Sequence, residues 1–160
     1  MRRSWKIAVS TAVMLAAPSV LSLTPAVAST DSQKFTIRAT TVQSKDVDVD
    51  GDGKYSQGDV FVFSDTLKED GEKVGTDGGV CTATRVASEK DYTIQCVVTF
   101  DLPKGQITAQ SLLDAEDIER GEFTQAITGG TGSYKDAGGE MSVEFLHDGA
   151  EFTFDIDDLG

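Results

Sequence analysis

The chain has 160 residues, a length typical of one globular domain. Its 27 acidic residues outnumber its 14 basic residues, so the formal net charge is −13. This balance argues against a protein that binds nucleic acid or an anionic membrane surface, because both partners require clustered Lys and Arg. Two cysteines and one histidine are too few for a structural zinc site built from these residue types.

The first predicted element is a secretory signal peptide over residues 1–28. Arg2, Arg3 and Lys6 precede an apolar stretch from 7 to 23, and Ala-Val-Ala at 26–28 supplies a small-residue cleavage site. The competing interpretation is a membrane anchor, but Ser, Thr and Pro interrupt the stretch, whose apolar segments are shorter than the ~20 residues that span a bilayer. We therefore expect a secreted, extracellular protein that does not contact the membrane after cleavage.

Residues 29–160 are expected to form one mature domain, whose net charge becomes −16 when three basic residues leave with the signal. Short runs of alternating apolar and polar residues, separated by turn residues, predict β-strands throughout this domain. In chain order the predicted strands cover residues 34–42, 59–66, 79–86, 92–101, 106–113, 123–128, 139–146 and 151–157.

Between the first two strands lies an acidic loop with the sequence DVDGDGKYSQGD over residues 48–59. Its spacing resembles an EF-hand loop, in which alternate oxygens converge on a hard cation. The candidate calcium ligands are Asp48, Asp50, Asp52, the backbone carbonyl of Lys54, Ser56 and Asp59. Asp replaces the usual Glu at the last position, and strand-like sequence replaces the flanking helices. A solvated Asp/Gly loop is the alternative interpretation.

The third and fourth predicted strands form a hairpin that carries both cysteines. A tight turn between them places Cys81 opposite Cys96 and Arg85 opposite Tyr92. We expect a disulfide between the cysteines, because export delivers them to an oxidising compartment. Two reduced cysteines in a buried apolar layer are the alternative.

A helix competes with a strand over residues 112–120, but the poor apolar spacing predicts a loop or a single helical turn. Eight strands with short connections predict an all-β fold, an antiparallel up-and-down β-barrel, because closure removes the exposed edges of a meander. The interior of such a barrel is wide enough for packed side chains or one small ligand. A β-sandwich is the alternative.

Two regions resemble the allene oxide cyclase barrel-like/dirigent superfamily. GDVFVFSDTL at 58–67, followed by VGTDGG at 74–79, is similar to a strand-and-loop signature of dirigent-like proteins, and AITGGTGSYKDAGGE at 126–140 is similar to their GGTG turn. The resemblance implies an eight-stranded barrel that holds an apolar small molecule and needs no redox cofactor. Members cyclise fatty-acid epoxides, steer phenoxy-radical coupling or close polyketide rings, and several form homodimers or homotrimers.

The candidate catalytic residues are Asp65, Arg85 and Tyr92. The resemblance implies a pocket-lining acid at Asp65, although Ser64 replaces the acidic neighbour found in dirigent proteins. Strand alternation puts Arg85 on the face of the cysteines, where it would orient a ligand carbonyl or carboxylate together with Tyr92. The alternative is an arginine at the strand end that extends into solvent.

Three functions remain open. The barrel binds an apolar metabolite without chemistry, or it is a cofactor-free cyclase, isomerase or stereo-directing protein. The third is a structural or interaction protein of the cell exterior with a filled barrel. An open cavity with converging polar side chains favours the second, and a lumen filled by Phe and Leu favours the third.

Overall fold

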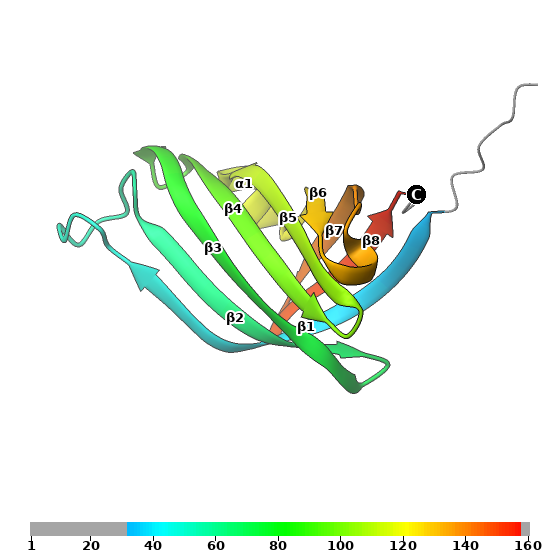
Figure 1. Ribbon diagram of the computed structural model, residues 1–160. Helices are drawn as coiled ribbons and strands as arrows, with labels where there is room; N and C mark the ends of the chain where they lie inside the picture. Colours follow the sequence, from blue (N-terminus) through cyan, green and yellow to red (C-terminus); the bar gives the residue numbers. More distant parts are fainter. Residues whose placement is uncertain (1–31, 158–160) are drawn as a thin grey trace, which may run out of the picture.

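The computed structural model describes residues 32–157, so the predicted signal peptide lies outside the described residues. Eight antiparallel strands pair in sequence order, and the first also pairs with the last to close a barrel (Figure 1). This closure confirms the predicted up-and-down barrel and excludes the sandwich. Within 32–157, no helix has the length and apolar character required to cross a membrane.

The strands differ in length from those predicted, chiefly β1 and β3, which are several residues longer than expected. They are β1 Gln33–Val47, β2 Val60–Glu69, β3 Glu72–Ser88, β4 Asp91–Leu102, β5 Gly105–Asp114, β6 Glu122–Gly130, β7 Gly139–Leu146 and β8 Gly149–Ile156. In Figure 1, β1 and β2 extend beyond the shorter strands β6 to β8 and carry the acidic loop away from the barrel body.

A short helix, α1 Ala115–Arg120, connects β5 to β6 where a single helical turn was one of the predictions. Asp114 and Asp117 form a capping box, each side chain accepting a hydrogen bond from the backbone N–H of the other. Gly121 ends the helix with a positive φ of 72°, a conformation that glycine adopts without strain. The GGTG region contains one turn of 3-10 helix, η1 Gly132–Tyr134.

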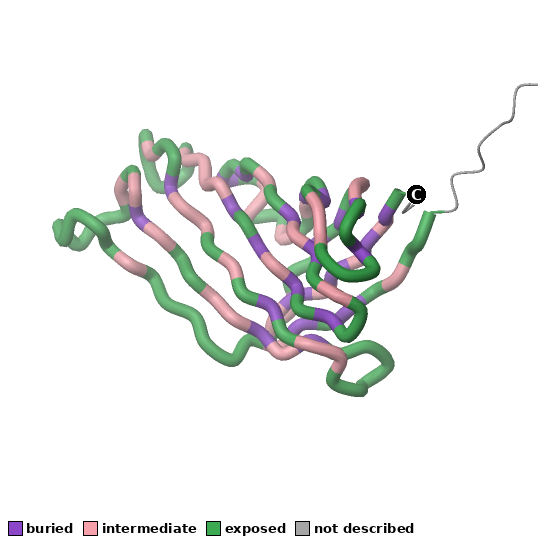
Figure 2. The backbone as a smooth tube through the Cα atoms, in the orientation of Figure 1, coloured by how far each residue is buried: buried purple, intermediate pink, exposed green. Residues whose placement is uncertain are grey.

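One end of the barrel is filled by buried apolar side chains. The ring of Phe100 packs edge-on against Phe152 and Phe154, with centroid distances of 4.9 and 5.0 Å. The other large, fully buried side chains of this core are Leu67, Ile107, Met141 and Ile156. In Figure 2 the acidic loop and the adjoining part of β1 are exposed, whereas the buried segments gather within the barrel body.

The β3–β4 register confirms the predicted disulfide and corrects one predicted neighbour. Cys81 lies opposite Cys96 and is bonded to it, with the two Cα atoms 4.0 Å apart. Beyond this bridge a register shift between Ala83 and Arg85 places Arg85 opposite Thr93 instead of Tyr92. Such a bulge inserts one extra residue and turns the following side chains to the other face. The predicted cross-strand pairs of this hairpin are therefore correct only as far as Ala83, which lies opposite Ile94.

Candidate functional site

The half of the barrel beside the acidic loop encloses a cavity of about 740 Å³. This volume lies within the range of pockets that hold drug-sized ligands. Most of the wall consists of apolar side chains from the strands, including Ile94, Val98, Leu113, Phe123, Val143, Ala150 and Phe152. The disulfide between Cys81 and Cys96 also lies in the wall, and Ile118 of α1 adds to it.

Two pairs of aromatic rings form part of this wall. Phe61 and Phe63 of β2 stack with centroids 5.8 Å apart, whereas Phe123 of β6 and Phe145 of β7 meet edge-on at 5.3 Å. The ring of Phe63 lies against the backbone of Gly79, its cross-strand partner on β3. A Cβ atom at Gly79 would come within 2.2 Å of the Phe63 Cζ. The glycine thus allows the ring to lie flat against the barrel wall.

Two aspartates lie side by side in the barrel interior. Asp65 of β2 and Asp77 of β3 are cross-strand partners, and each is only 5% exposed. The backbone N–H of Asp65 donates to Oδ1 of Asp77 at 3.1 Å. Asp65 lines the cavity, whereas Asp77 is not among the residues that line it. The carboxyl of Asp65 therefore contacts the cavity directly, whereas that of Asp77 lies behind it and contacts Asp65.

Burial and mutual repulsion change the acidity of this pair. Burial raises the pKa of Asp65. Burial, followed by the nearby charge of Asp65, raises the pKa of Asp77 to about 7. Two carboxyls in such contact titrate as a unit, because ionising one disfavours ionising the other. The pair therefore retains a proton close to neutral pH.

Three buried oxygens of the barrel interior have no hydrogen-bond partner among the described residues: Asp65 Oδ1, Asp77 Oδ2 and Gln125 Oε1. Gln125 of β6 is 5% exposed and, like Asp65, lines the cavity. All three oxygens are acceptors when the carboxyls are ionised. A buried acceptor without a donor is costly, so the cavity favours a ligand that supplies donors or positive charge.

The structure places Arg85 and Tyr92 away from the cavity wall. The guanidinium of Arg85 hydrogen-bonds the carboxylate of Asp91 at the exposed end of the hairpin. Tyr92 packs edge-on against Tyr55, with ring centroids 5.4 Å apart, and Tyr55 itself lines the cavity mouth. The expectation that Arg85 shares the inward layer is therefore wrong, because the bulge before it turns its side chain into solvent.

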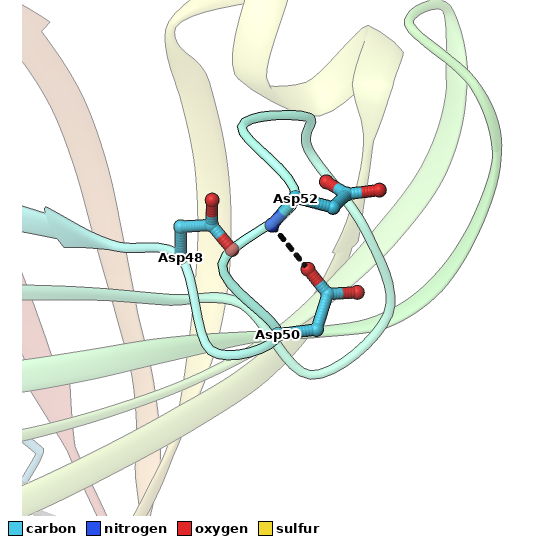
Figure 3. A group of neighbouring side chains, drawn as sticks. All are labelled: Asp48, Asp50 and Asp52. Carbon is cyan, nitrogen blue, oxygen red and sulfur yellow. Dashed lines mark hydrogen bonds between the residues drawn. The ribbon is translucent and has the colours of Figure 1, made fainter.

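The acidic loop brings three of its predicted ligands together. Oxygen atoms of Asp48, Asp50 and Asp52 lie within 4.8 Å of one another, and all three residues are exposed (Figure 3). The carboxylate of Asp48 accepts hydrogen bonds from the backbone N–H groups of Gly53 at 2.7 Å and Gly51 at 2.6 Å. These bonds, chiefly that from Gly53, lower the pKa of Asp48.

Of the remaining predicted ligands, Ser56 contacts this cluster, whereas Lys54 and Asp59 have other contacts. Ser56 joins the cluster, because its hydroxyl donates to Oδ2 of Asp50 at 3.1 Å. Lys54 lines the cavity mouth. Asp59 is 6% exposed, and its two oxygens accept from the backbone N–H groups of Val49 at 2.9 Å and Ser56 at 2.8 Å. Asp59 thus closes the loop on itself, and its carboxylate is not in the three-residue cluster.

The family resemblance placed Asp77 in a loop near the pocket mouth without giving it a role in the site, and Gln125 was missed. The Gly-rich segment VGTDGG around Asp77 carries little strand signal, although the Asp70-Gly71 turn predicts a hairpin that would bring Asp77 close to Asp65. Gln125 lies on the same inward face of β6 as Phe123 and Ile127. A polar residue at an apolar position of the strand alternation could have identified it as a site residue.

An eight-stranded antiparallel barrel with an apolar cavity and a buried acid defines a class of fold, and the comparisons identify the same class. The model of the allene oxide cyclase barrel like domain matches residues 36–156, so the chain belongs to this family. The comparison with curated protein sequences finds no match.

Solved structures of several activities share the fold. A pyocyanin demethylase is 33% identical, with a TM-score of 0.69 over 78% of this chain and 99% of that chain. An exo-specific intermolecular Diels-Alderase is 15% identical, with a TM-score of 0.64 over 79% of this chain and 98% of that chain. A pterocarpan synthase dirigent protein is 20% identical, with a TM-score of 0.54 over 79% and 82% of the two chains. The last two likenesses concern the fold alone.

Proposed function

We propose that this protein binds an apolar small molecule in the barrel cavity and acts on it as a cofactor-independent cyclase, isomerase or stereo-directing protein. The observation that carries this proposal is the position of Asp65, a buried acid on the wall of an open apolar cavity. A filled, purely structural barrel has no use for such a group, because burying a carboxyl costs free energy.

The acid pair supports a role in moving a proton. Asp77 has a pKa of about 7, so the coupled pair exchanges a proton near neutral pH. Asp65 is the member that lines the cavity and would make the contact with the ligand. Rearrangement and ring closure both require charge to shift within the substrate. A carboxyl that gives or accepts a proton in a dry cavity assists such a shift.

The likeness to a pyocyanin demethylase supports a small-molecule ligand, and the aromatic wall of the cavity favours one that has a flat ring system. The proposal extends to the rest of the chain: residues 1–28 are a cleaved secretion signal, and 29–160 form one secreted barrel domain. The disulfide between Cys81 and Cys96 supports secretion, since such bonds persist in oxidising compartments.

The three clustered carboxylates of the acidic loop support weak structural calcium binding.

A pair of adjacent leucines on β5 provides a matched test of binding. Leu113 lines the cavity and is 3% exposed, whereas Leu112 faces outward and is 62% exposed. We expect fluorescence of the neutral dye Nile red to show saturable binding to the protein and to the Leu112→Trp variant. The Leu113→Trp variant should remain folded by circular dichroism and bind the dye more weakly, because the larger indole occupies part of the cavity. Equal binding by both variants, or none by the unsubstituted protein, contradicts the proposal.

A further inference from the structure

We infer that the cavity is built for a flat aromatic cation, whose rings lie between the aromatic walls and whose delocalised positive charge faces Asp65. This inference rests on the proposed function and names the chemical class of its ligand. It stands on three observations: the charges around the cavity, the buried oxygens without donors, and the rings that line the wall.

The charged residues of the cavity are predominantly acidic. Asp46, Asp48, Asp59 and Asp65 line it, against the single basic residue Lys54. Lys54 belongs to the exposed acidic loop at the mouth, and the carboxylate of Asp59 is held by two backbone N–H groups. Asp65 is therefore the charged group of the inner wall. An anionic ligand would place like charges together where little water screens them.

The buried oxygens favour the same class of ligand. Asp65 Oδ1 and Gln125 Oε1 belong to side chains that are 95% buried and line the cavity, and once Asp77 is ionised no described residue donates a hydrogen bond to either oxygen. A neutral hydrocarbon would cover these oxygens without replacing the hydrogen bonds of water. A cation, or a ring that carries an N–H group, satisfies them. The unpartnered acceptors thus select against a ligand that carries neither a positive charge nor an N–H donor.

The walls are suited to hold such a cation by its faces. Six aromatic residues line the cavity: Tyr55, Phe61, Phe63, Phe123, Phe145 and Phe152. Phe61 and Phe63 belong to β2, whereas Phe123 and Phe145 belong to β6 and β7, which lie four and five strands further around the closed barrel. The two ring pairs therefore stand on opposite sides of the lumen. Aromatic faces carry negative partial charge and attract cations placed over them.

The inference is tested with two probes of nearly the same shape, N-methylacridinium and acridine, at about pH 8, where acridine is neutral. We expect the cation to bind about tenfold more tightly than acridine, measured by fluorescence titration. The Asp65→Asn variant should reduce this ratio to about twofold or less, while its affinity for acridine stays within about threefold of the unsubstituted protein.

Non-specific attraction of a cation to an acidic protein requires its own control. The Asp50→Asn/Asp52→Asn variant removes two exposed charges from the loop that do not line the cavity, and should leave the ratio of affinities unchanged. Titration in about 0.5 M NaCl should preserve most of the preference, since salt screens surface charges more than buried ones. A preference that disappears in salt, or with the loop variant, overturns the inference.

The comparison of the two probes on the unsubstituted protein decides the question even if Asp65→Asn fails to fold. Binding of acridine as tightly as the cation overturns the inference and leaves the proposed function standing. A ratio unchanged in folded Asp65→Asn protein also overturns it. Failure of both probes and of Nile red to bind contradicts the proposed function itself.

Discussion

The backbone N–H of Asp65 donates a hydrogen bond to Oδ1 of Asp77, 3.1 Å away across the β2–β3 hairpin. This bond fixes the side chain of Asp77 beside a second carboxyl in a buried place. An Asn at position 77 would keep the accepting oxygen and remove the charge. A nearly isosteric Asn at position 77 can therefore test the effect of the charge while the hydrogen bond is kept.

We predict that Asp77→Asn stabilises the protein at about pH 8. The folded-state pKa of Asp77, about 7, lies above its ordinary value of 3.8. The unfolded chain therefore loses this proton first as the pH rises. Stability falls between these two values, by up to about 1.4 kcal/mol per pH unit, and is constant above them. Urea unfolding of the variant should show a flatter pH dependence; lower stability than the unsubstituted protein at about pH 8 would contradict this account.

Gly79→Ala should reduce the volume of the cavity. The added Cβ would lie 2.2 Å from the Phe63 Cζ, so the ring must move toward the lumen. We expect weaker Nile red binding with a folded barrel. Gly78→Ala is the matched control, because its Cβ would meet nothing closer than the Phe63 carbonyl oxygen at 3.8 Å. Equal dye affinity in the two variants would show that Phe63 does not limit the cavity.

Asp59→Asn should destabilise the fold by about 1–3 kcal/mol. Both carboxylate oxygens accept backbone hydrogen bonds, from Val49 and Ser56, and an amide replaces one acceptor with a donor that faces an N–H group. Amide hydrogen exchange should accelerate at Val49 and Ser56. Asp52→Asn, an exposed change in the same loop, is expected to have a smaller effect on the unfolding free energy. A larger decrease in unfolding free energy for Asp52→Asn than for Asp59→Asn would contradict the stabilising role of Asp59.

Calcium binding by the acidic loop remains a prediction, with an expected Kd of ~10⁻⁴–10⁻³ M. Asp48, Asp50 and Asp52 hold their oxygens close together, while Asp59 is engaged elsewhere, so few protein ligands are available and weak binding follows. Isothermal calorimetry should show heat with the protein and none with Asp50→Ala/Asp52→Ala. Absence of heat and an unchanged Tm on addition of chelator would contradict it.

The outer face of the barrel offers a place for the expected homodimer or homotrimer. Val62, Val80 and Val97 are cross-strand neighbours on β2, β3 and β4, and each is 38 to 40% exposed. An uncharged row allows two acidic molecules to approach with little repulsion. Light scattering should show that Val80→Lys lowers the molecular mass in solution. Thr124→Lys, an exposed change on β6, is the control. A monomeric unsubstituted protein contradicts the prediction.

The barrel and the disulfide follow from the sequence because both depend on strand alternation, a signal repeated in every strand. Arg85 was predicted on the inward face, but one extra residue in a bulge reverses the face of the side chains after it, and the alternative position in solvent at the strand end is the one observed. Asp77 was predicted in a loop near the pocket mouth and not beside Asp65, because its strand, β3, begins at Glu72, within a Gly-rich segment that carries little strand signal. The glycine that weakens the strand signal at position 79 is the one that makes room for Phe63.

The packing of Phe100 against Phe152 and Phe154 closes one end of the barrel, while the cavity opens at the other. A molecule must therefore enter and leave by the same route, and one ligand must depart before a second can enter. A ligand longer than the cavity leaves its trailing part in solvent. The end that enters first is the one that reaches Asp65, so the direction of entry determines which part of an asymmetric ligand lies against that carboxyl.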